Sequence, residues 1–139
     1  MKIITDEIKQ ILSPCVATIG CFDGLHRGHR FLIEQVCREA RQRNFHSALI
    51  TFPVHPRQVM QSNYRPQLLT CLPQKTALIQ QTEADYCIML PFTKELSLLS
   101  ARQFMQLLRE RFNVRVLVIG YDHVRLHVFC HLILLTAGK

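Results

Sequence analysis

The most informative motif of this chain lies at residues 18–29, where the sequence is Thr-Ile-Gly-Cys-Phe-Asp-Gly-Leu-His-Arg-Gly-His. It overlaps the end of an apolar run, Cys15–Ile19, that is typical of a buried strand. Its three glycines allow tight turns and a close approach of the backbone to a ligand. Near the third glycine the chain is expected to enter a helix, whose free N–H groups and positive dipole end bind anions. We therefore predict that residues 18–29 form a loop that binds nucleotide phosphate. The part of it that follows the strand, residues 20–29, is here called the phosphate loop.

Two histidines of the phosphate loop, His26 and His29, are three residues apart and can lie on the same side of the helix entrance. Partly protonated imidazoles there can donate hydrogen bonds to oxygens that gain charge during phosphoryl chemistry, with no covalent intermediate. Plainer interpretations exist for each part, because glycines also build ordinary turns and a single histidine beside a helix is usually a solvated surface residue. The pair could also bind a metal, but no third ligand at suitable spacing is evident, so no metal site is predicted.

Short apolar runs alternate with helical periodicities along the chain. Strands are predicted at residues 15–19, 47–52, 86–90 and 114–119, the last ending at Gly120, and helices at 29–43, at 73–81 and from an N-cap at Ser100 through Phe112. This alternation predicts an α/β fold with a parallel sheet covered by helices on both faces. Ligands of such sheets bind outside the carboxyl ends of the strands. The unusual segments follow the predicted strands, at residues 20–29, 53–57, 91–99 and 120 onward.

Length and composition predict one globular domain, because 139 residues with 48% apolar and 19% charged side chains can bury a single core. The net charge of +7 is compatible with nucleic acid, an acidic membrane surface or a phosphorylated small molecule as partner. The densest basic stretch, residues 38–43, is typical of the polar end of a helix. Basic and aromatic residues do not interleave as they do in nucleic-acid-binding proteins, so no nucleic-acid partner is expected.

The six cysteines form neither a Cys-x-x-Cys pair nor a zinc-like spacing with histidine, and most have apolar neighbours. This pattern is typical of reduced, mostly buried thiols in a cytosolic protein. The N-terminal residues lack the basic segment and apolar core of a signal peptide. No uncharged apolar run reaches the roughly 18 residues that a membrane span needs. We expect a cytoplasmic protein without a membrane partner.

The chain resembles the FMN adenylyltransferase module of bacterial bifunctional riboflavin kinase/FAD synthetase in the motif Gly20-x-Phe22-Asp23-Gly24-x-His26-x-Gly28-His29. The His-x-Gly-His core is shared with many nucleotidyltransferases, and the preceding Gly-x-Phe-Asp-Gly makes the match more specific. Further segments agree in order and spacing, at residues 51–57, 68–70, 75, 85–86, 91–104 and 118–122. One departure is Val54, where the family usually has proline. The resemblance covers residues 1–123 and implies a Rossmann-like nucleotidyltransferase fold.

The resemblance implies the reaction ATP + FMN → FAD + pyrophosphate, with Mg²⁺ assisting. An FMN phosphate oxygen would attack the α-phosphorus of ATP in line, while His26 and His29 steady the phosphates. The nucleotide-binding residues that it implies are Thr18, Gly20, Cys21, Phe22, Asp23, Gly24, Gly28, Gly120 and Asp122. Those that it implies for FMN are Pro56, Arg57, Phe92 and Phe104. On periodicity alone, core packing is the simpler explanation for Phe92 and Phe104. Asp23 could be only a turn former.

The resemblance ends after Asp122. The family continues with Phe-Arg-Phe-Gly, whereas this chain has His123-Val124-Arg125-Leu126 and then an apolar run. We therefore predict a nucleotidyltransferase domain at residues 1–123, incomplete at its C-terminal end, and an aberrant tail at 124–139. A frameshift, an artefact or a truncated gene would each explain this change. The apolar run at 128–135 would form an extra strand or, if exposed, a surface for self-association.

Two parts of the related enzymes have no counterpart in this sequence. One is a later Ser-Ser-Thr-x-x-Arg-type motif that completes their ATP phosphate site, and the other is the riboflavin kinase domain. Kinase activity is therefore not expected, and adenylyl transfer is expected to be impaired. Two other functions stay open: a non-catalytic fragment that binds a nucleotide or flavin, and a related His-x-Gly-His adenylyltransferase or cytidylyltransferase with another acceptor.

Overall fold

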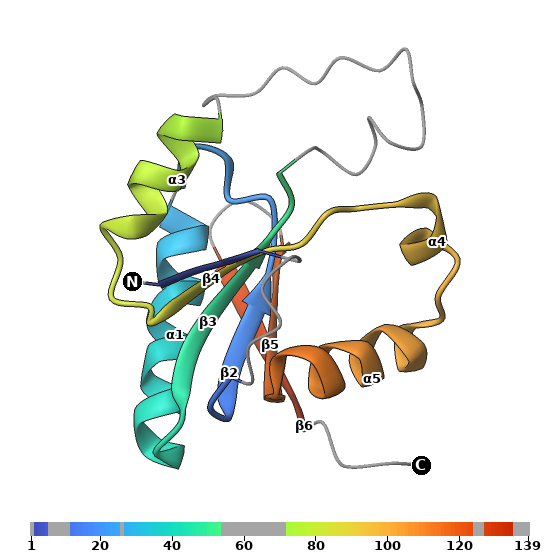
Figure 1. Cartoon of the computed structure of the whole chain (residues 1–139). Coiled ribbons are helices and arrows are strands. Elements are labelled where there is room, and N and C mark those ends of the chain that lie inside the picture. Colours follow the sequence, from blue (N-terminus) through green and yellow to red (C-terminus); the bar gives the residue numbers. More distant parts are fainter. Residues whose placement is uncertain (1, 6–11, 26, 54–71, 124–126, 135–139) are drawn as a thin grey trace.

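The computed structural model describes residues 2–5, 12–25, 27–53, 72–123 and 127–134 (Figure 1). Its strands are β1 (Lys2–Thr5), β2 (Cys15–Ile19), β3 (His46–Thr51), β4 (Tyr86–Met89), β5 (Val114–His123) and β6 (His127–Leu134). Its helices are the short 3₁₀ helix η1 (Asp23–Leu25) and the α-helices α1 (Arg27–Arg43), α3 (Leu72–Gln80), α4 (Lys94–Ser97) and α5 (Ala101–Phe112). None of these described helices is long and apolar enough to cross a membrane.

The described strands form one sheet in the order β1-β4-β3-β2-β5-β6. Neighbours from β1 through β5 pair in parallel, and β6 pairs antiparallel with β5. Parallel neighbours require crossovers, and α1 lies between β2 and β3 while α3 lies between β3 and β4. Helix α5 leads from β4 to β5, which pairs with the other side of β2. The predicted α/β fold with a parallel sheet is confirmed. The extra strand predicted for the apolar run near the C-terminal end is present as β6.

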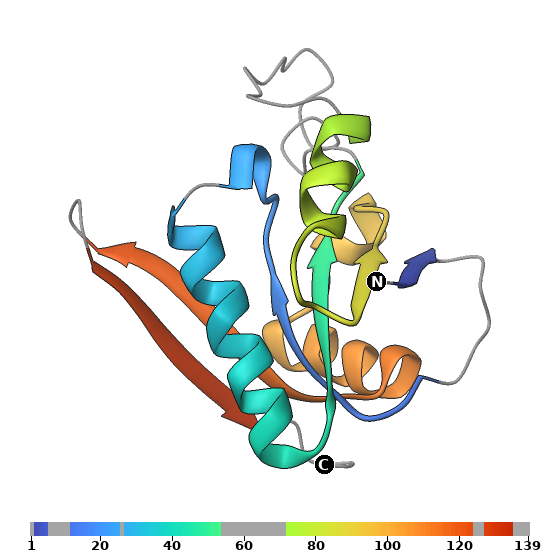
Figure 2. The same ribbon diagram turned by 90° about the vertical axis from the view of Figure 1, so that its left-hand side faces the viewer.

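Helices cover both faces of the sheet, as predicted (Figures 1 and 2). Successive residues of a strand point to opposite faces, so Val16 packs with α1 whereas Ala17 packs with α5. The buried residues on the side of α1 and α3 include Val16, Leu32, Ile33, Val36, Cys37, Leu49, Ile79 and Cys87. Those on the side of α5 include Cys15, Ala17, Ala48, Ile50, Ile88, Leu108, Phe112 and Leu117. Because both faces are buried, the central strands are continuous apolar runs rather than alternating ones.

Helix α5 begins where the sequence predicted. The Ser100 hydroxyl oxygen accepts the N–H of Gln103 at 3.1 Å, and the Gln103 side-chain oxygen accepts the N–H of Ser100 at 2.9 Å. These reciprocal bonds form a capping box. The helix ends at Phe112, and its C-cap Asn113, with a φ of 56°, turns the chain directly into β5. Local signals therefore fix where α5 ends and β5 begins.

Strand β5 is longer than predicted. The predicted strand, residues 114–119, ends at Gly120, and that end is wrong because β5 continues to His123. Gly120 pairs with Cys130, and Asp122 pairs with Val128. The backbone beyond Ile119 continues as a strand because β6 supplies a ladder of partners for it. Strand β1 and the single-turn helix α4 are further elements that the apolar pattern did not predict.

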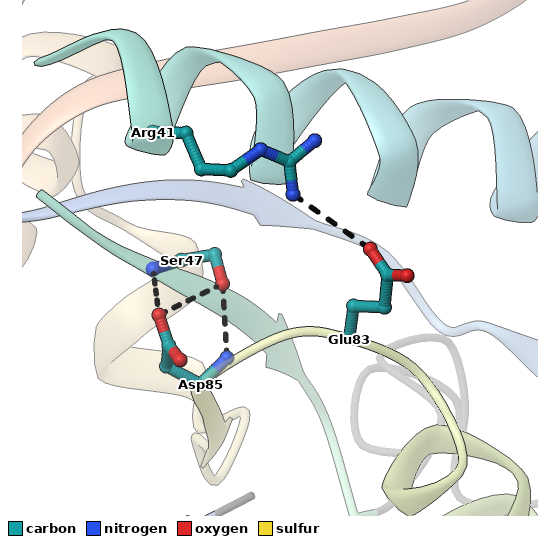
Figure 3. Close-up of polar contacts among 4 residues, drawn as sticks. All are labelled: Arg41, Ser47, Glu83 and Asp85. Carbon is teal, nitrogen blue, oxygen red and sulfur yellow. Dashed lines mark hydrogen bonds and ion pairs between the residues drawn. The ribbon is translucent and has the colours of Figure 1, made fainter. Parts of the chain in front are cut away.

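A polar staple joins the amino ends of β3 and β4 (Figure 3). Oδ2 of Asp85 accepts the backbone N–H of Ser47 at 2.9 Å and the Ser47 hydroxyl at 3.2 Å. The N–H of Asp85 donates in return to the Ser47 Oγ at 2.9 Å. A salt bridge of 3.7 Å joins Arg41 to Glu83 nearby, between two mostly exposed side chains. The staple helps to hold the register of the two strands, whose carboxyl ends meet at the opposite edge of the sheet.

Candidate active site

The order of the strands changes direction beside β2. From β2 the chain crosses through α1 to β3, whereas α5, on the other face, leads to β5 at the other edge of β2. Doubly wound sheets bind their ligands at such a switch point, outside the carboxyl ends of the strands. The phosphate loop follows β2 directly and therefore lies at the switch point.

Two buried side chains anchor the first half of the phosphate loop. Phe22 and Leu25 are 1% and 2% exposed, although their φ values of 53° and 47° are left-handed. A left-handed conformation costs such residues roughly 1–2 kcal/mol each, which burial of their apolar side chains offsets. Gly24, with a φ of 71°, adopts the same region without this cost. The core beneath the loop thus holds its backbone in one conformation.

The predicted catalytic residue His29 lies in the first turn of α1 and is half-buried. Its ring makes a T-shaped contact with the ring of Phe22, with centroids 5.3 Å apart and planes at 71°. Helix α1 begins at Arg27, two residues before the predicted start, so Gly28 and His29 belong to the turn whose N–H groups can face an anion. The other predicted catalytic residue, His26, lies outside the described residues.

Thr18 is a buried polar residue at the end of β2. Its side chain is wholly buried, and its Oγ1 has no hydrogen-bond partner within the described ranges of the chain. Buried hydroxyl groups normally have a partner, because an unsatisfied one loses its hydration without compensation. Among the residues predicted to bind the nucleotide, Thr18 therefore has the clearest unmet hydrogen-bonding capacity.

A chain of polar contacts connects α3 to the phosphate loop. The Lys75 Nζ donates to Oγ1 of Thr51 at 3.2 Å and to the carbonyl oxygen of Phe52 at 3.0 Å. The Thr51 hydroxyl donates to the carbonyl oxygen of Cys21 at 3.3 Å. No role for Lys75 was predicted from the sequence. The available signal was its spacing of four residues from Ile79, which places a lysine on the buried stripe of α3.

The residues predicted to bind FMN are only partly described. Phe92 follows β4 and makes a T-shaped contact with Phe52 after β3, with ring centroids 5.5 Å apart. Phe104 is half-buried in α5 and packs against the core on that side. Pro56 and Arg57 lie outside the described residues. The aromatic residues on the α5 side thus lie at the carboxyl ends of β3 and β4 and on the adjoining helix.

The remaining predicted nucleotide-binding residues divide between the loop and β5. Gly20 follows β2, and its N–H donates to the carbonyl oxygen of Ile50 at 3.0 Å, which ties the start of the loop to β3. Asp23 belongs to η1. Gly120 and Asp122 lie within the paired length of β5. The structure therefore gathers the phosphate loop, Thr18 and His29 at the end of β2.

Two other features are relevant to ligand binding. A groove of about 410 Å³ runs between α1 and the turn after α3, where it is lined by residues such as Arg30, Arg38, Arg41 and Glu83. It lies on the flank of α1, and its lining includes none of the residues predicted to bind nucleotide or FMN. Within the described ranges, no three His, Cys, Asp or Glu side chains are grouped so as to hold a metal ion.

Comparison with known families agrees with this arrangement. The sequence profile of the FAD synthetase family matches residues 8–125. The chain belongs to the FAD synthetase family. That match includes β2, the phosphate loop, α1 and the Lys75–Thr51–Cys21 contacts.

Curated relatives of this FAD synthetase family member carry the name bifunctional riboflavin kinase/FMN adenylyltransferase. The one from Escherichia coli K12 is 34% identical over 109 residues, which cover 78% of this chain and 35% of the relative. The one from Listeria monocytogenes is 34% identical over 123 residues, which cover 87% of this chain and 38% of the relative. The one from Buchnera aphidicola of Schizaphis graminum is 30% identical over 125 residues, which cover 88% of this chain and 40% of the relative. The match thus spans well under half the length of each relative.

A solved structure shares the fold. The crystal structure of a protein described as a macrolide-efflux protein from Streptococcus pneumoniae superimposes with a TM-score of 0.75. The matched region covers 88% of this chain and 49% of the Streptococcus pneumoniae chain, at 21% sequence identity. This likeness establishes the Rossmann-like architecture alone.

Proposed function

We propose that this chain carries out FMN adenylyl transfer, ATP + FMN → FAD + pyrophosphate. The observation that carries the proposal is the position of the phosphate loop at the end of β2, with His29 in the first turn of α1 and in contact with Phe22. Membership in the FAD synthetase family supports the same reaction. The loop offers an anion site at a helix N-terminus, as the transfer of a nucleotidyl group requires.

In the proposed reaction, an oxygen of the FMN phosphate attacks the α-phosphorus of ATP. A new P–O bond forms as the bond between the α-phosphorus and the bridging oxygen to the β-phosphorus breaks, and pyrophosphate leaves with that electron pair. His29 and His26 donate hydrogen bonds to oxygens that gain charge in this step. The N–H groups at the start of α1 bind phosphate oxygens, and Phe22 holds the His29 ring in place.

The proposed nucleotide site uses the backbone around Thr18, Gly20, Cys21, Phe22, Asp23, Gly24 and Gly28, with Gly120 and Asp122 from β5. The proposed FMN site uses Pro56, Arg57, Phe92 and Phe104. Mg²⁺ would enter with ATP, and the described part of the chain groups no three His, Cys, Asp or Glu side chains that could hold it by themselves. When bound, the ion neutralises phosphate charge. The unmet capacity of Thr18 Oγ1 supports a polar ligand near the end of β2.

The proposed domain covers residues 1–123, with an aberrant tail at 124–139 that supplies β6. A cytoplasmic location and self-association through residues 128–135 stay predictions. The two alternatives named above, a non-catalytic nucleotide- or flavin-binding fragment and a related transferase with another acceptor, differ from the proposal in what the chain produces.

The test is to incubate the purified chain with ATP, Mg²⁺ and FMN and to measure FAD and pyrophosphate by chromatography. We expect FAD to form and His29→Ala to reduce its rate by about 100-fold or more. The matched control is His46→Ala, because His46 is an exposed histidine at the amino end of β3. Binding of ATP or FMN without product would favour the non-catalytic alternative. Product that forms only when FMN is replaced by another acceptor would favour the related transferase.

A further inference from the structure

Lys75 is a nearly buried lysine beside the phosphate loop. Its exposed fraction is 9%, and it lies on the same stripe of α3 as the fully buried Ile79. Burial of an ammonium group is costly unless hydrogen bonds compensate it. Lys75 donates such bonds to neutral oxygens at the carboxyl end of β3, the Thr51 hydroxyl and the Phe52 carbonyl.

The charge of Lys75 sets the direction of the Thr51 hydroxyl. An ammonium group can only donate, so the Thr51 oxygen must accept from Lys75. The single hydroxyl hydrogen of Thr51 is then directed to its other partner, the carbonyl oxygen of Cys21. The contacts therefore have one polarity, from Lys75 through Thr51 to the phosphate loop.

This polarity sets the orientation of a peptide group in the loop. The described residues contain no cis peptide bond, so the Cys21–Phe22 peptide is trans. In a trans peptide the C=O and the following N–H point in opposite directions. Since the Cys21 carbonyl points toward Thr51, the N–H of Phe22 points away from β3. The same peptide leads into the left-handed Phe22, whose ring contacts His29.

We propose that Lys75 is a positioning residue that acts on the phosphate loop through Thr51. It holds the Cys21–Phe22 peptide in the orientation that binds nucleotide phosphates and that places Phe22 against His29. This role rests on the proposed function, because it concerns the loop that would hold ATP. Lys75 itself touches neither substrate in this proposal.

The experiment compares Lys75→Met, Thr51→Val and Thr51→Ser with the full-length wild-type chain. Equilibrium titration with MgATP and, separately, with FMN measures the affinity for each ligand. We expect Lys75→Met and Thr51→Val each to weaken MgATP binding by about tenfold, the usual scale for a lost charge-assisted hydrogen bond, with FMN affinity within about twofold. Thr51→Ser keeps the hydroxyl and should keep the affinity. The double variant Lys75→Met/Thr51→Val should bind no more weakly than Lys75→Met, because both substitutions interrupt one path.

A second measurement decides the question independently of catalysis. Amide hydrogen exchange of residues 20–25 should accelerate in Lys75→Met and Thr51→Val, while exchange in α5 stays unchanged. Lys2→Met removes an exposed lysine at the amino end of β1 and serves as the matched control. If the wild-type chain forms no FAD, the proposed function fails, but exchange in residues 20–25 still tests the role of Lys75. Unchanged exchange there, equal losses of MgATP and FMN affinity, or additive effects in the double variant would each overturn the proposal.

Discussion

The ring of Phe22 meets the ring of His29 in a T-shaped contact, with centroids 5.3 Å apart. Phe22 belongs to the core between η1, α1 and β3, so the imidazole rests on a rigid apolar base. Aromatic pairs of this geometry add roughly 0.5–1.5 kcal/mol beyond the burial of their surface. The contact therefore couples the conformation of the phosphate loop to the orientation of the predicted catalytic side chain.

Phe22→Leu should separate this orienting effect from core stability. Leucine fills much of the space but lacks the ring, so we expect FAD formation to slow by about tenfold and stability to fall by about 1–2 kcal/mol. Phe112→Leu is the matched control, because Phe112 is buried in α5 far from the loop. It should lose similar stability with little loss of rate. Steady-state kinetics and urea unfolding measure the two quantities, and equal rate losses in both variants would contradict an orienting role.

Asp85→Ala should destabilise the chain by about 2 kcal/mol, because it removes the acceptor of two bonds from Ser47 and leaves those donors without it. Glu83→Ala removes the neighbouring carboxylate from an exposed salt bridge and should change stability by less than about 0.5 kcal/mol. Urea unfolding of the two variants makes the comparison. Similar losses of stability in the two variants would show that the staple of β3 and β4 stabilises the chain no more than the exposed salt bridge does.

Alkaline pH should destabilise the folded state through its buried thiols. Burial raises the pKa of Cys87 from 9.0 to about 11, with the nearby Lys75 charge opposing, and raises that of Cys15 to about 12. Above pH 9 the unfolded chain loses these protons while the folded chain keeps them, so the free energy of unfolding falls as the pH approaches 11. Below pH 9 the contribution is fully present. Cys87→Ala should show a shallower fall over this interval, and an equal slope in both chains would contradict the assignment.

Cys21 should be alkylated faster than the other cysteines whose side chains are described. It is partly exposed in the phosphate loop, whereas Cys15, Cys37 and Cys87 are buried. Maleimide labelling, mapped by mass spectrometry of each cysteine-containing peptide, measures the rates. MgATP should slow the labelling of Cys21 if it covers the loop. Fast labelling of Cys21 at saturating MgATP would argue against its place in the nucleotide site.

Short-range signals in the sequence predicted most of the regular elements. Strand β2 begins and ends at the predicted residues, and Ser100 caps α5 as predicted. Apolar spacing and capping depend on side chains within a few positions of one another, so they can be recognised without the fold. The glycines and histidines of the phosphate loop form an equally local pattern. Family membership then bore out the resemblance that this pattern suggested.

Long-range contacts set the features that the sequence did not predict. The extension of β5 beyond Ile119 depends on pairing with β6, although the apolar run of β6 was itself recognisable. Lys75 meets Thr51 across 24 residues, and Thr51 meets Cys21 across 30. Spacing indicates which residues share one face of a helix or strand. It does not indicate which oxygen a buried ammonium will meet, because that depends on how α3 packs against the sheet.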